Sequence, residues 1–134
     1  MTDLELINLA VEARKKAYAP YSHFRVGAAL VGKSGKIYTG CNVENAAYTP
    51  TNCAERTAVF KAVSEGETEF SAIAIVGGKG ENLADSCAPC GVCRQVLAEF
   101  CEPNFRIVLG KPENVKTYTF AELLPCSFGK NDLE

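Results

Sequence analysis

The chain has 134 residues, of which 47% are hydrophobic and 22% charged, and its net charge is −2 at neutral pH. This length fits one domain, so we expect a single domain over residues 1–134. The slight negative charge and the scattered lysines and arginines disfavour a nucleic-acid partner. No segment approaches the roughly 20 apolar residues that span a bilayer, and the acidic start of the chain does not resemble a signal peptide. Seven cysteines without a secretory signal favour a reducing, cytoplasmic location with free or metal-bound thiols.

The first half of the chain begins with a helix signal and continues with a hairpin. Thr2 and Glu5 form a capping-box pattern, and apolar residues at helical spacing predict an amphipathic helix that runs up to Pro20. Two apolar segments, 24–31 and 36–41, flank a glycine-containing turn and predict a β-hairpin. A polar loop over 42–50 leads to a helix over about 52–65, which stops at Gly66. The apolar segment 70–76 predicts a strand buried on both faces.

The second half predicts one more helix and a second pair of strands. A glycine-rich loop over 77–88 precedes Pro89, a residue suited to a first helical position, and a helix over about 90–100. Segments 105–109 and 117–120 predict strands that pair antiparallel, because the connection 110–116 is too short for a helical crossover. A short helical piece over 121–124 follows. The order αββαβαββ predicts a three-layer α/β/α sandwich around a mixed five-stranded sheet.

Cys53, Glu55, Cys90 and Cys93 stand at the predicted starts of two helices. Helix N-termini carry partial positive charge and free N–H groups, which lower the pKa of a cysteine and favour the thiolate. Cys90 and Cys93 are three residues apart, so they share a helix face and can reach one ion. Three sulfur ligands hold Zn²⁺ with one tetrahedral position open to water, and Glu55 can lie beside that water. The pattern predicts a catalytic zinc site, with ordinary buried thiols and a surface glutamate as the alternative.

The remaining cysteines leave a second metal hypothesis open. Cys87 extends the pattern to Cys87-x-x-Cys90-x-x-Cys93, which also begins an iron–sulfur motif, with Cys53 or Cys101 as a further ligand. Position 97 is not cysteine and no Cys-Pro follows, and this hypothesis gives Glu55 no role. Simple buried or spare thiols are the expectation for Cys41, Cys101 and Cys126, and His23 is expected in a loop rather than at a metal.

With these residues the chain resembles the cytidine deaminase family, in particular its small homotetrameric zinc enzymes with three cysteine ligands. The resemblance covers nearly the whole chain and rests on the segments 18–22, 24–29, 40–48, 53–58 and 123–125. It implies hydrolytic deamination of cytidine and deoxycytidine to uridine and deoxyuridine plus ammonia, in pyrimidine salvage. It also implies one Zn²⁺ per chain on Cys53, Cys90 and Cys93, and Glu55 as the catalytic residue that moves protons from water to N3 and to the leaving amine.

The resemblance further implies a nucleoside pocket. Asn42 and Glu44, two apart in an extended segment, would hydrogen-bond the ribose 3′-OH. Phe24 would pack against the pyrimidine, the backbone at Ala54 would meet its polar edge, and Arg56 would donate hydrogen bonds to the ligand sulfurs. The rest of the implied set is Asn45, Ala46 and Tyr48 in the substrate loop and Phe128, which would close the pocket of a neighbouring subunit.

Each pocket residue could also have a purely structural role: a simple turn for the loop, an exposed helix position for Arg56 and a loosely packed tail for Phe128. Blasticidin deaminases share the zinc core, and nucleic-acid cytosine deaminases use related machinery. The absence of a basic surface and the short final connection argue against polynucleotides. Phe24 together with Asn42 and Glu44 favours a free nucleoside over an antibiotic.

Overall fold

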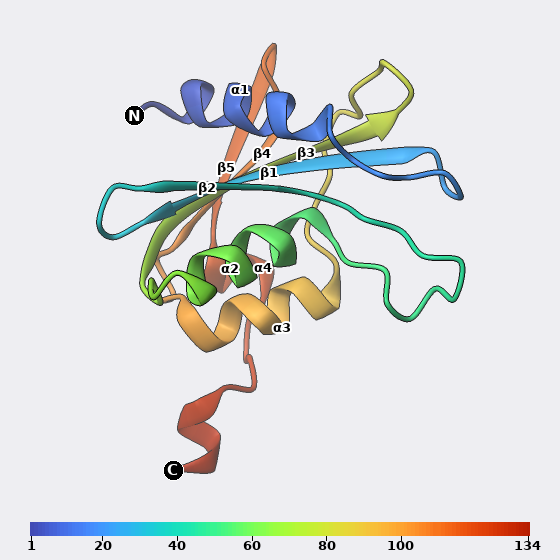
Figure 1. Ribbon diagram of the computed structural model, residues 1–134. Coiled ribbons are helices and arrows are strands. Elements are labelled where there is room, and N and C mark those ends of the chain that lie inside the picture. The colour runs from blue at the N-terminus through green and yellow to red at the C-terminus, as the bar shows by residue number, and fades with distance from the viewer.

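The computed structural model describes residues 1–134 and is built on a five-stranded sheet with the strand order β2-β1-β3-β4-β5 (Figure 1). The strands are β1 (Phe24–Gly32), β2 (Ile37–Cys41), β3 (Phe70–Lys79), β4 (Arg106–Lys111) and β5 (Asn114–Thr119). The helices are α1 (Asp3–Arg14), α2 (Ala54–Ser64), α3 (Gly91–Phe100), α4 (Phe120–Leu123) and the 3-10 helix η1 (Lys130–Leu133). Only β3 and β4 pair in parallel, so the predicted mixed sheet is confirmed.

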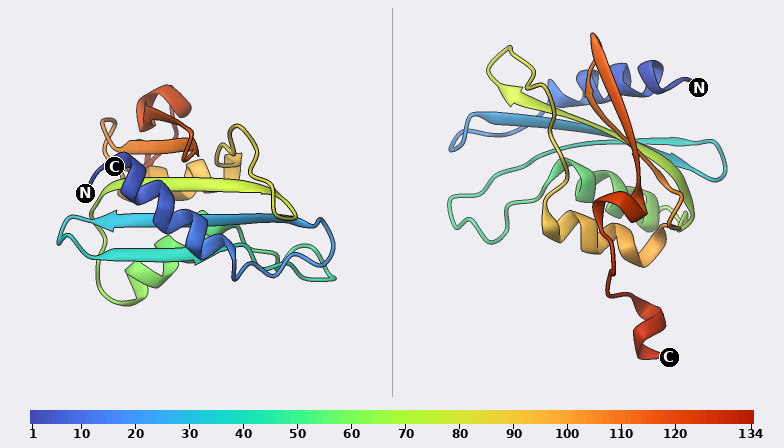
Figure 2. Two further views of the ribbon diagram at one scale, coloured as in Figure 1. Left: turned by 90° about the horizontal axis from the view of Figure 1, so that it is seen from above. Right: turned by 180° about the vertical axis from the view of Figure 1, so that it is seen from behind.

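The helices form layers on the two faces of the sheet. Figure 2 shows α1 lying across one face, while α2 and α3 cover the other. Strand β3 is buried on both sides: Ile73 and Ile75 belong to the core under α2 and α3, and Ala74 belongs to the core under α1. Burying side chains of isoleucine size contributes about 1.5–3 kcal/mol each. The three-layer α/β/α arrangement predicted from the sequence is therefore present.

Two glycines let the helices approach the sheet closely. A Cβ on Gly27 of β1 would collide with the backbone of α1 at Ala10 and Arg14. A Cβ on Gly40 of β2 would lie 2.5 Å from the Ala54 carbonyl oxygen and 2.6 Å from the Ala58 nitrogen. Any larger residue at Gly40 would push α2, and with it the region of Cys53, away from the sheet.

Several predicted boundaries were wrong. Helix α1 ends at Arg14 rather than near Pro20, because the Tyr18 N–H leaves the helical pattern and donates to the Asn42 carbonyl at 3.0 Å. Helix α3 begins at Gly91, one residue after the predicted start, because Cys90 is its N-cap and Pro89 directly precedes the cap.

The last hairpin also differs from its prediction. Lys111 pairs with Asn114, so a tight two-residue turn starts β5 earlier than position 117. Thr119 caps α4 with a capping box, which places Phe120 in a helix and not in the strand. None of the helices in this fold is long and apolar enough to cross a membrane.

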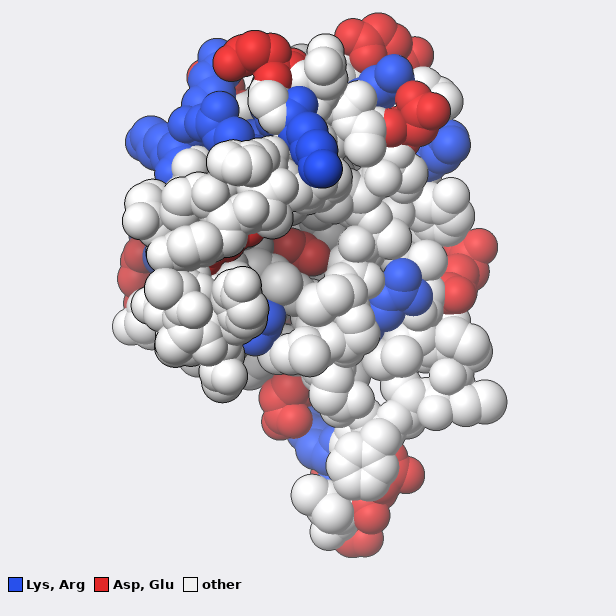
Figure 3. Space-filling view, turned by 90° about the vertical axis from the view of Figure 1, so that its right-hand side faces the viewer, with Lys and Arg blue, Asp and Glu red and all other residues white.

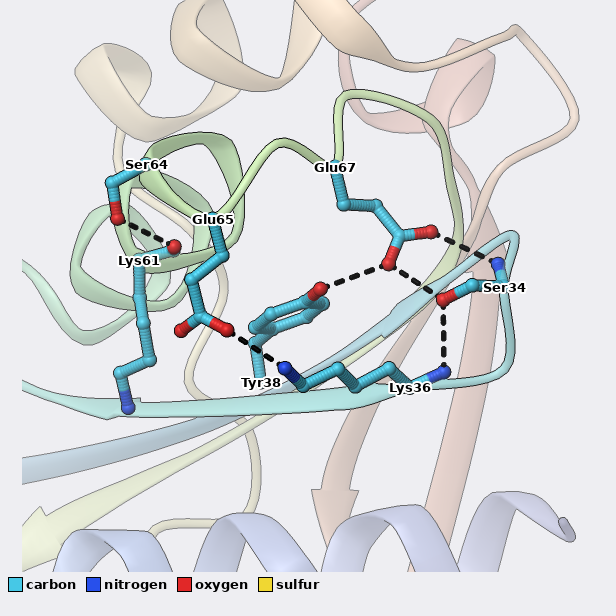
Figure 4. Close-up of polar contacts among 7 residues, drawn as sticks. All are labelled: Ser34, Lys36, Tyr38, Lys61, Ser64, Glu65 and Glu67. Atoms are coloured by element: carbon cyan, nitrogen blue, oxygen red, sulfur yellow. Dashed lines mark hydrogen bonds and ion pairs between the residues drawn. The ribbon is translucent and has the colours of Figure 1, made fainter.

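A polar network fastens the end of the sheet next to the C-terminus of α2 (Figure 4). The Glu67 carboxylate accepts hydrogen bonds from the Ser34 N–H at 2.9 Å, the Ser34 hydroxyl at 2.7 Å and the Tyr38 hydroxyl at 2.9 Å. Lys36 and Glu65 form an ion pair of 2.7 Å beside it. These contacts connect the β1–β2 turn to the α2–β3 connection. The site described next lies at the opposite, N-terminal end of α2.

Candidate metal centre and active site

Helices α2 and α3 begin on the same side of the molecule, the right-hand side of Figure 1. Cys53 is the N-cap of α2 and Cys90 the N-cap of α3, where the Cys90 sulfur accepts the Cys93 N–H at 3.5 Å. Both helices therefore direct the positive ends of their dipoles toward the cysteines. As predicted, helix geometry brings residues from two distant segments together.

The three cysteine sulfurs lie within 4.8 Å of one another, and the Cys53 and Cys90 sulfurs are 3.8 Å apart. Two tetrahedral ligands with Zn–S bonds of about 2.3 Å are about 3.8 Å apart, so this donor set suits zinc. None of the seven cysteines forms a disulfide.

Cys87 does not join this group of sulfurs. Its side chain packs instead over β3, where a Cβ on Gly77 would come within 2.7 Å of the Cys87 sulfur. Burial raises the pKa of the Cys87 thiol to about 12. The iron–sulfur arrangement that includes Cys87 is therefore not the one that the fold assembles.

Arg56 supplies positive charge to the sulfurs. Its Nη2 group donates to the Cys53 sulfur at 3.2 Å, while its buried Nε has no hydrogen-bond partner. Hydrogen bonds from the Cys93 thiol and from Arg56 lower the pKa of Cys53 to about 5. The pKa of Cys93 is raised because it donates to Cys53 and is buried. Arg56 is thus hydrogen-bonded to the Cys53 sulfur instead of lying free on an exposed helix face.

Glu55 lies in the first turn of α2, two residues after Cys53, and is only 4% exposed. Burial, with a smaller contribution from the charge of the Cys53 thiolate, raises the pKa of its carboxyl group to about 7. A carboxyl group with such a pKa exchanges a proton readily near neutral pH. The surface position that was the alternative for Glu55 is excluded by its burial.

The side chains of Asn42 and Glu44 form hydrogen bonds with residues 21–26 of the same chain, which the sequence did not predict. The Asn42 amide donates to the Phe24 carbonyl and accepts the Val26 N–H, both at 2.8 Å. The Glu44 carboxylate accepts the hydroxyl and N–H of Ser22 and the N–H of Tyr21. The Ser22 hydroxyl is the main reason that the pKa of Glu44 is lowered. Both side chains therefore hold the segment that leads into β1.

The other predicted pocket residues differ in exposure. Ala54 is fully buried at the start of α2, whereas Asn45, Ala46 and Tyr48 are exposed in the loop between β2 and α2. Asn45 shapes this loop, since its side chain accepts the Ala47 N–H at 2.9 Å. Phe128 is 58% exposed in the C-terminal segment, which leaves the body beyond α3 and α4 (Figure 1). The Phe128 carbonyl accepts a hydrogen bond from the Gln95 side chain of α3 at 2.9 Å.

Figure 3 views the side where α2 and α3 begin and shows a hollow with acidic atoms deep inside it. Two other hollows, of about 460 and 480 Å³, lie elsewhere: one between α3 and the C-terminal segment, and one beside Glu67. Neither contains the converging donors, so the chemistry of the residues, and not volume, identifies the site.

The sequence model of the "cytidine and deoxycytidylate deaminase zinc-binding region" matches residues 1–109. The chain belongs to this family. It is 49% identical to the cytidine deaminase of Sporosarcina psychrophila over 130 residues, which covers 96% of this chain and 93% of that protein. The crystal structure of cytidine deaminase from Burkholderia pseudomallei superposes with a TM-score of 0.87 at 49% identity, over 96% of this chain and all of that one. A more distant family member is the blasticidin-S deaminase of Bacillus cereus, which is 32% identical over 133 residues, 96% of this chain and 94% of that protein.

Proposed function

We propose that this chain hydrolyses cytidine and deoxycytidine to uridine and deoxyuridine plus ammonia, with one zinc ion held by Cys53, Cys90 and Cys93. The observation that carries the proposal is the convergence of these three sulfurs, within 4.8 Å of one another, next to the buried Glu55. When bound, Zn²⁺ acts as a Lewis acid that makes water a nucleophile near neutral pH.

Glu55 moves the protons of this reaction. The attacking water supplies two hydrogens: Glu55 transfers one to N3 of the ring and the other to the departing amino group. The C4–N bond breaks, a C4=O bond forms and ammonia leaves, so no further reactant is needed. A single buried carboxyl group with a raised pKa can accept and donate each proton in turn.

The substrate contacts follow the residues around this centre. Phe24 packs against the pyrimidine, and the backbone at Ala54 meets its polar edge. Asn42 and Glu44 bind the ribose 3′-OH, and the remaining lining is Asn45, Ala46 and Tyr48. Arg56, which donates to the Cys53 sulfur at 3.2 Å, offsets the negative charge of three thiolates on one Zn²⁺.

The proposed enzyme is one domain over residues 1–134 that works in pyrimidine salvage in the cytoplasm. It assembles as a homotetramer in which Phe128 of one subunit closes the pocket of a neighbour. The exposure of Phe128 in the isolated chain supports this role, because an aromatic side chain in an extended tail is free to meet another subunit.

The first experiment follows the fall in ultraviolet absorbance when purified protein of known zinc content meets cytidine. We expect turnover with about one zinc per chain. Glu55→Gln should keep the zinc and lose about 10²–10⁴-fold in turnover, because the amide cannot carry the proton. Glu113→Gln, at an exposed glutamate in the β4–β5 turn, is the matched control and should behave as the wild type.

Two results would contradict the proposal. Normal turnover by Glu55→Gln with zinc bound would remove the glutamate from the mechanism. Zinc-loaded wild-type protein without activity on cytidine would point to another amine substrate, and blasticidin S would be tested next because a blasticidin-S deaminase is among the relatives.

A further inference from the structure

The segment Asn42–Glu44 is a junction between three parts of the chain. Its backbone exchanges hydrogen bonds with Tyr18, through the Tyr18 N–H to Asn42 at 3.0 Å and the Glu44 N–H to Tyr18 at 2.9 Å. On its other side Val43 and Asn52 exchange two hydrogen bonds of 3.0 and 2.9 Å. The turn before β1 and the segment before Cys53 are therefore joined through this one segment.

Asn42 holds the chain on both sides of Arg25. Its amide donates to the Phe24 carbonyl and accepts the Val26 N–H, so it replaces a neighbouring strand at the point where β2 has ended. Asn42 is only 8% exposed, and its backbone N–H donates to the Val26 carbonyl at 3.3 Å. Because both ends of the amide are bonded to backbone, the peptide that follows Phe24 has little freedom.

Glu44 holds the chain just before Phe24. The turn at Tyr21–His23 contains a non-glycine residue with positive φ, His23 at 60°, a conformation that is sparsely populated and needs support. The Glu44 carboxylate supplies it by accepting two backbone N–H groups, from Tyr21 at 3.0 Å and Ser22 at 3.1 Å. The Ser22 hydroxyl extends this support, since it donates to Glu44 and accepts the Phe24 N–H at 3.0 Å.

The Phe24 ring is confined from a third direction. A Cβ on Gly77 would lie 2.9 Å from the ring and 2.7 Å from the Cys87 sulfur, so ring and thiol lie side by side over the bare backbone of β3. With its amide and carbonyl also bonded, Phe24 is fixed in backbone and side chain.

We propose that Asn42 and Glu44 are positioning residues that hold Phe24 in place for the base, in addition to any contact with the sugar. The inference rests on the proposed function, in which Phe24 packs against the pyrimidine. Contacts made only to the 3′-OH would matter only for substrates that carry it. A role through Phe24 acts on the base and affects every cytosine nucleoside.

The test compares cytidine with 3′-deoxycytidine, which lacks only the 3′-OH. Asn42→Asp keeps an acceptor for a sugar hydroxyl but loses the donor to the Phe24 carbonyl. Ser22→Ala removes the hydroxyl between Glu44 and the Phe24 N–H without changing Glu44 itself. Ser64→Ala is the matched control, because the Ser64 hydroxyl bonds only the Lys61 carbonyl near the other end of α2.

We expect Asn42→Asp to lower kcat/KM by about 10–100-fold and Ser22→Ala by about 3–10-fold, because small misplacements of a binding group are costly. Each decrease should be equal for the two substrates within about twofold, with zinc content unchanged. Ser64→Ala should match the wild type.

The inference is overturned if Asn42→Asp impairs cytidine but not 3′-deoxycytidine, or if Ser22→Ala matches the control with both substrates. Should Asn42→Asp fail to fold, the exposed Ser22→Ala change decides alone. A wild-type protein that does not turn over cytidine would instead contradict the proposed function, so the two failures are distinguishable.

Discussion

Replacement of Arg14 by methionine tests how the loop before Cys90 and Cys93 is held. Arg14 is a charged residue at the end of α1, yet it is only 6% exposed. Its Nε donates to the Arg25 carbonyl at 3.0 Å. Its Nη2 group donates to the carbonyls of Gly78 and Gly80 at 2.7 Å and of Asn82 at 3.2 Å. Two hydrogens are thus shared among one carbonyl at the end of β3 and two in the loop that leads to Cys87 and Cys90.

The expected loss of stability follows from the burial of these carbonyls. Arg14→Met keeps the apolar stem and removes every donor. The hydrogen bond to Gly78 is buried, so that carbonyl would lose its partner at a cost of about 1–3 kcal/mol. The other three hydrogen bonds are partly buried, and their carbonyls can bind water instead. The loss of each of these bonds should therefore lower the free energy of unfolding by roughly 0.5 kcal/mol. The free energy of unfolding should fall by about 3 kcal/mol, which corresponds to a decrease of roughly 10 °C in Tm.

Thermal unfolding and hydrogen exchange measure the two parts of this prediction. The Ala84 N–H, which donates to the Gly77 carbonyl at 2.8 Å, should exchange faster in Arg14→Met, together with the rest of the loop. Lys15→Met is the matched control, because the Lys15 side chain is exposed and pairs only with Glu12. If Arg14→Met unfolded at the same temperature as Lys15→Met, with unchanged loop exchange, the carbonyls would not depend on Arg14 and the reasoning would be wrong.

Three further predictions concern the site, the acid stability and the packing of α2. Cys53→Ser should lower the zinc content far below the value of about one per chain expected for the wild type, as measured by elemental analysis, because one of the three proposed sulfur ligands is lost. The Ser34 hydrogen bonds lower the pKa of Glu67 below 4.5, so the stability they contribute is present above that value and is lost as the pH falls through the lower folded pKa. Acid should therefore destabilise the wild type more than Glu67→Gln, and equal acid-unfolding profiles would contradict this. Gly40→Ala should lower the Tm clearly, because its Cβ would lie within 2.6 Å of α2 backbone at Ala54 and Ala58, and an unchanged Tm would contradict it.

The convergence of the three cysteine sulfurs could be predicted from the sequence because local rules determine its geometry. A cysteine at the start of each helix, and in α3 a second cysteine three residues later, fix the direction of the sulfurs once the helices exist. The sequence could not show that Cys87 packs over Gly77, apart from the other three sulfurs, because that contact depends on the path of the 77–88 loop.

The contacts of the predicted pocket residues were less predictable, because they also join residues that lie far apart in the chain. Asn42 and Glu44 stand out in the sequence only as a polar pair, and their partners, Phe24 and Ser22, lie 18 and 22 residues earlier in the chain. The early end of α1 depends likewise on a hydrogen bond between Tyr18 and Asn42. Such pairings form only after the sheet is assembled, and no periodicity in the sequence records them.

The sulfurs depend on local helix geometry and the pocket on long-range contacts, so substitutions in these two parts should affect the proposed enzyme in different ways. The sulfurs of Cys53, Cys90 and Cys93 lie at the N-termini of α2 and α3, and both helices pack on the sheet through the core. The turn before β1 is connected to Cys53 through the hydrogen bonds between Val43 and Asn52. Phe24 depends on that turn and on the junction at Asn42–Glu44. Changes at the sulfurs should therefore reduce zinc content and turnover together, whereas changes at the junction should reduce turnover per bound zinc. A junction variant that lost its zinc in proportion to its activity would show that the two parts are one cooperative unit.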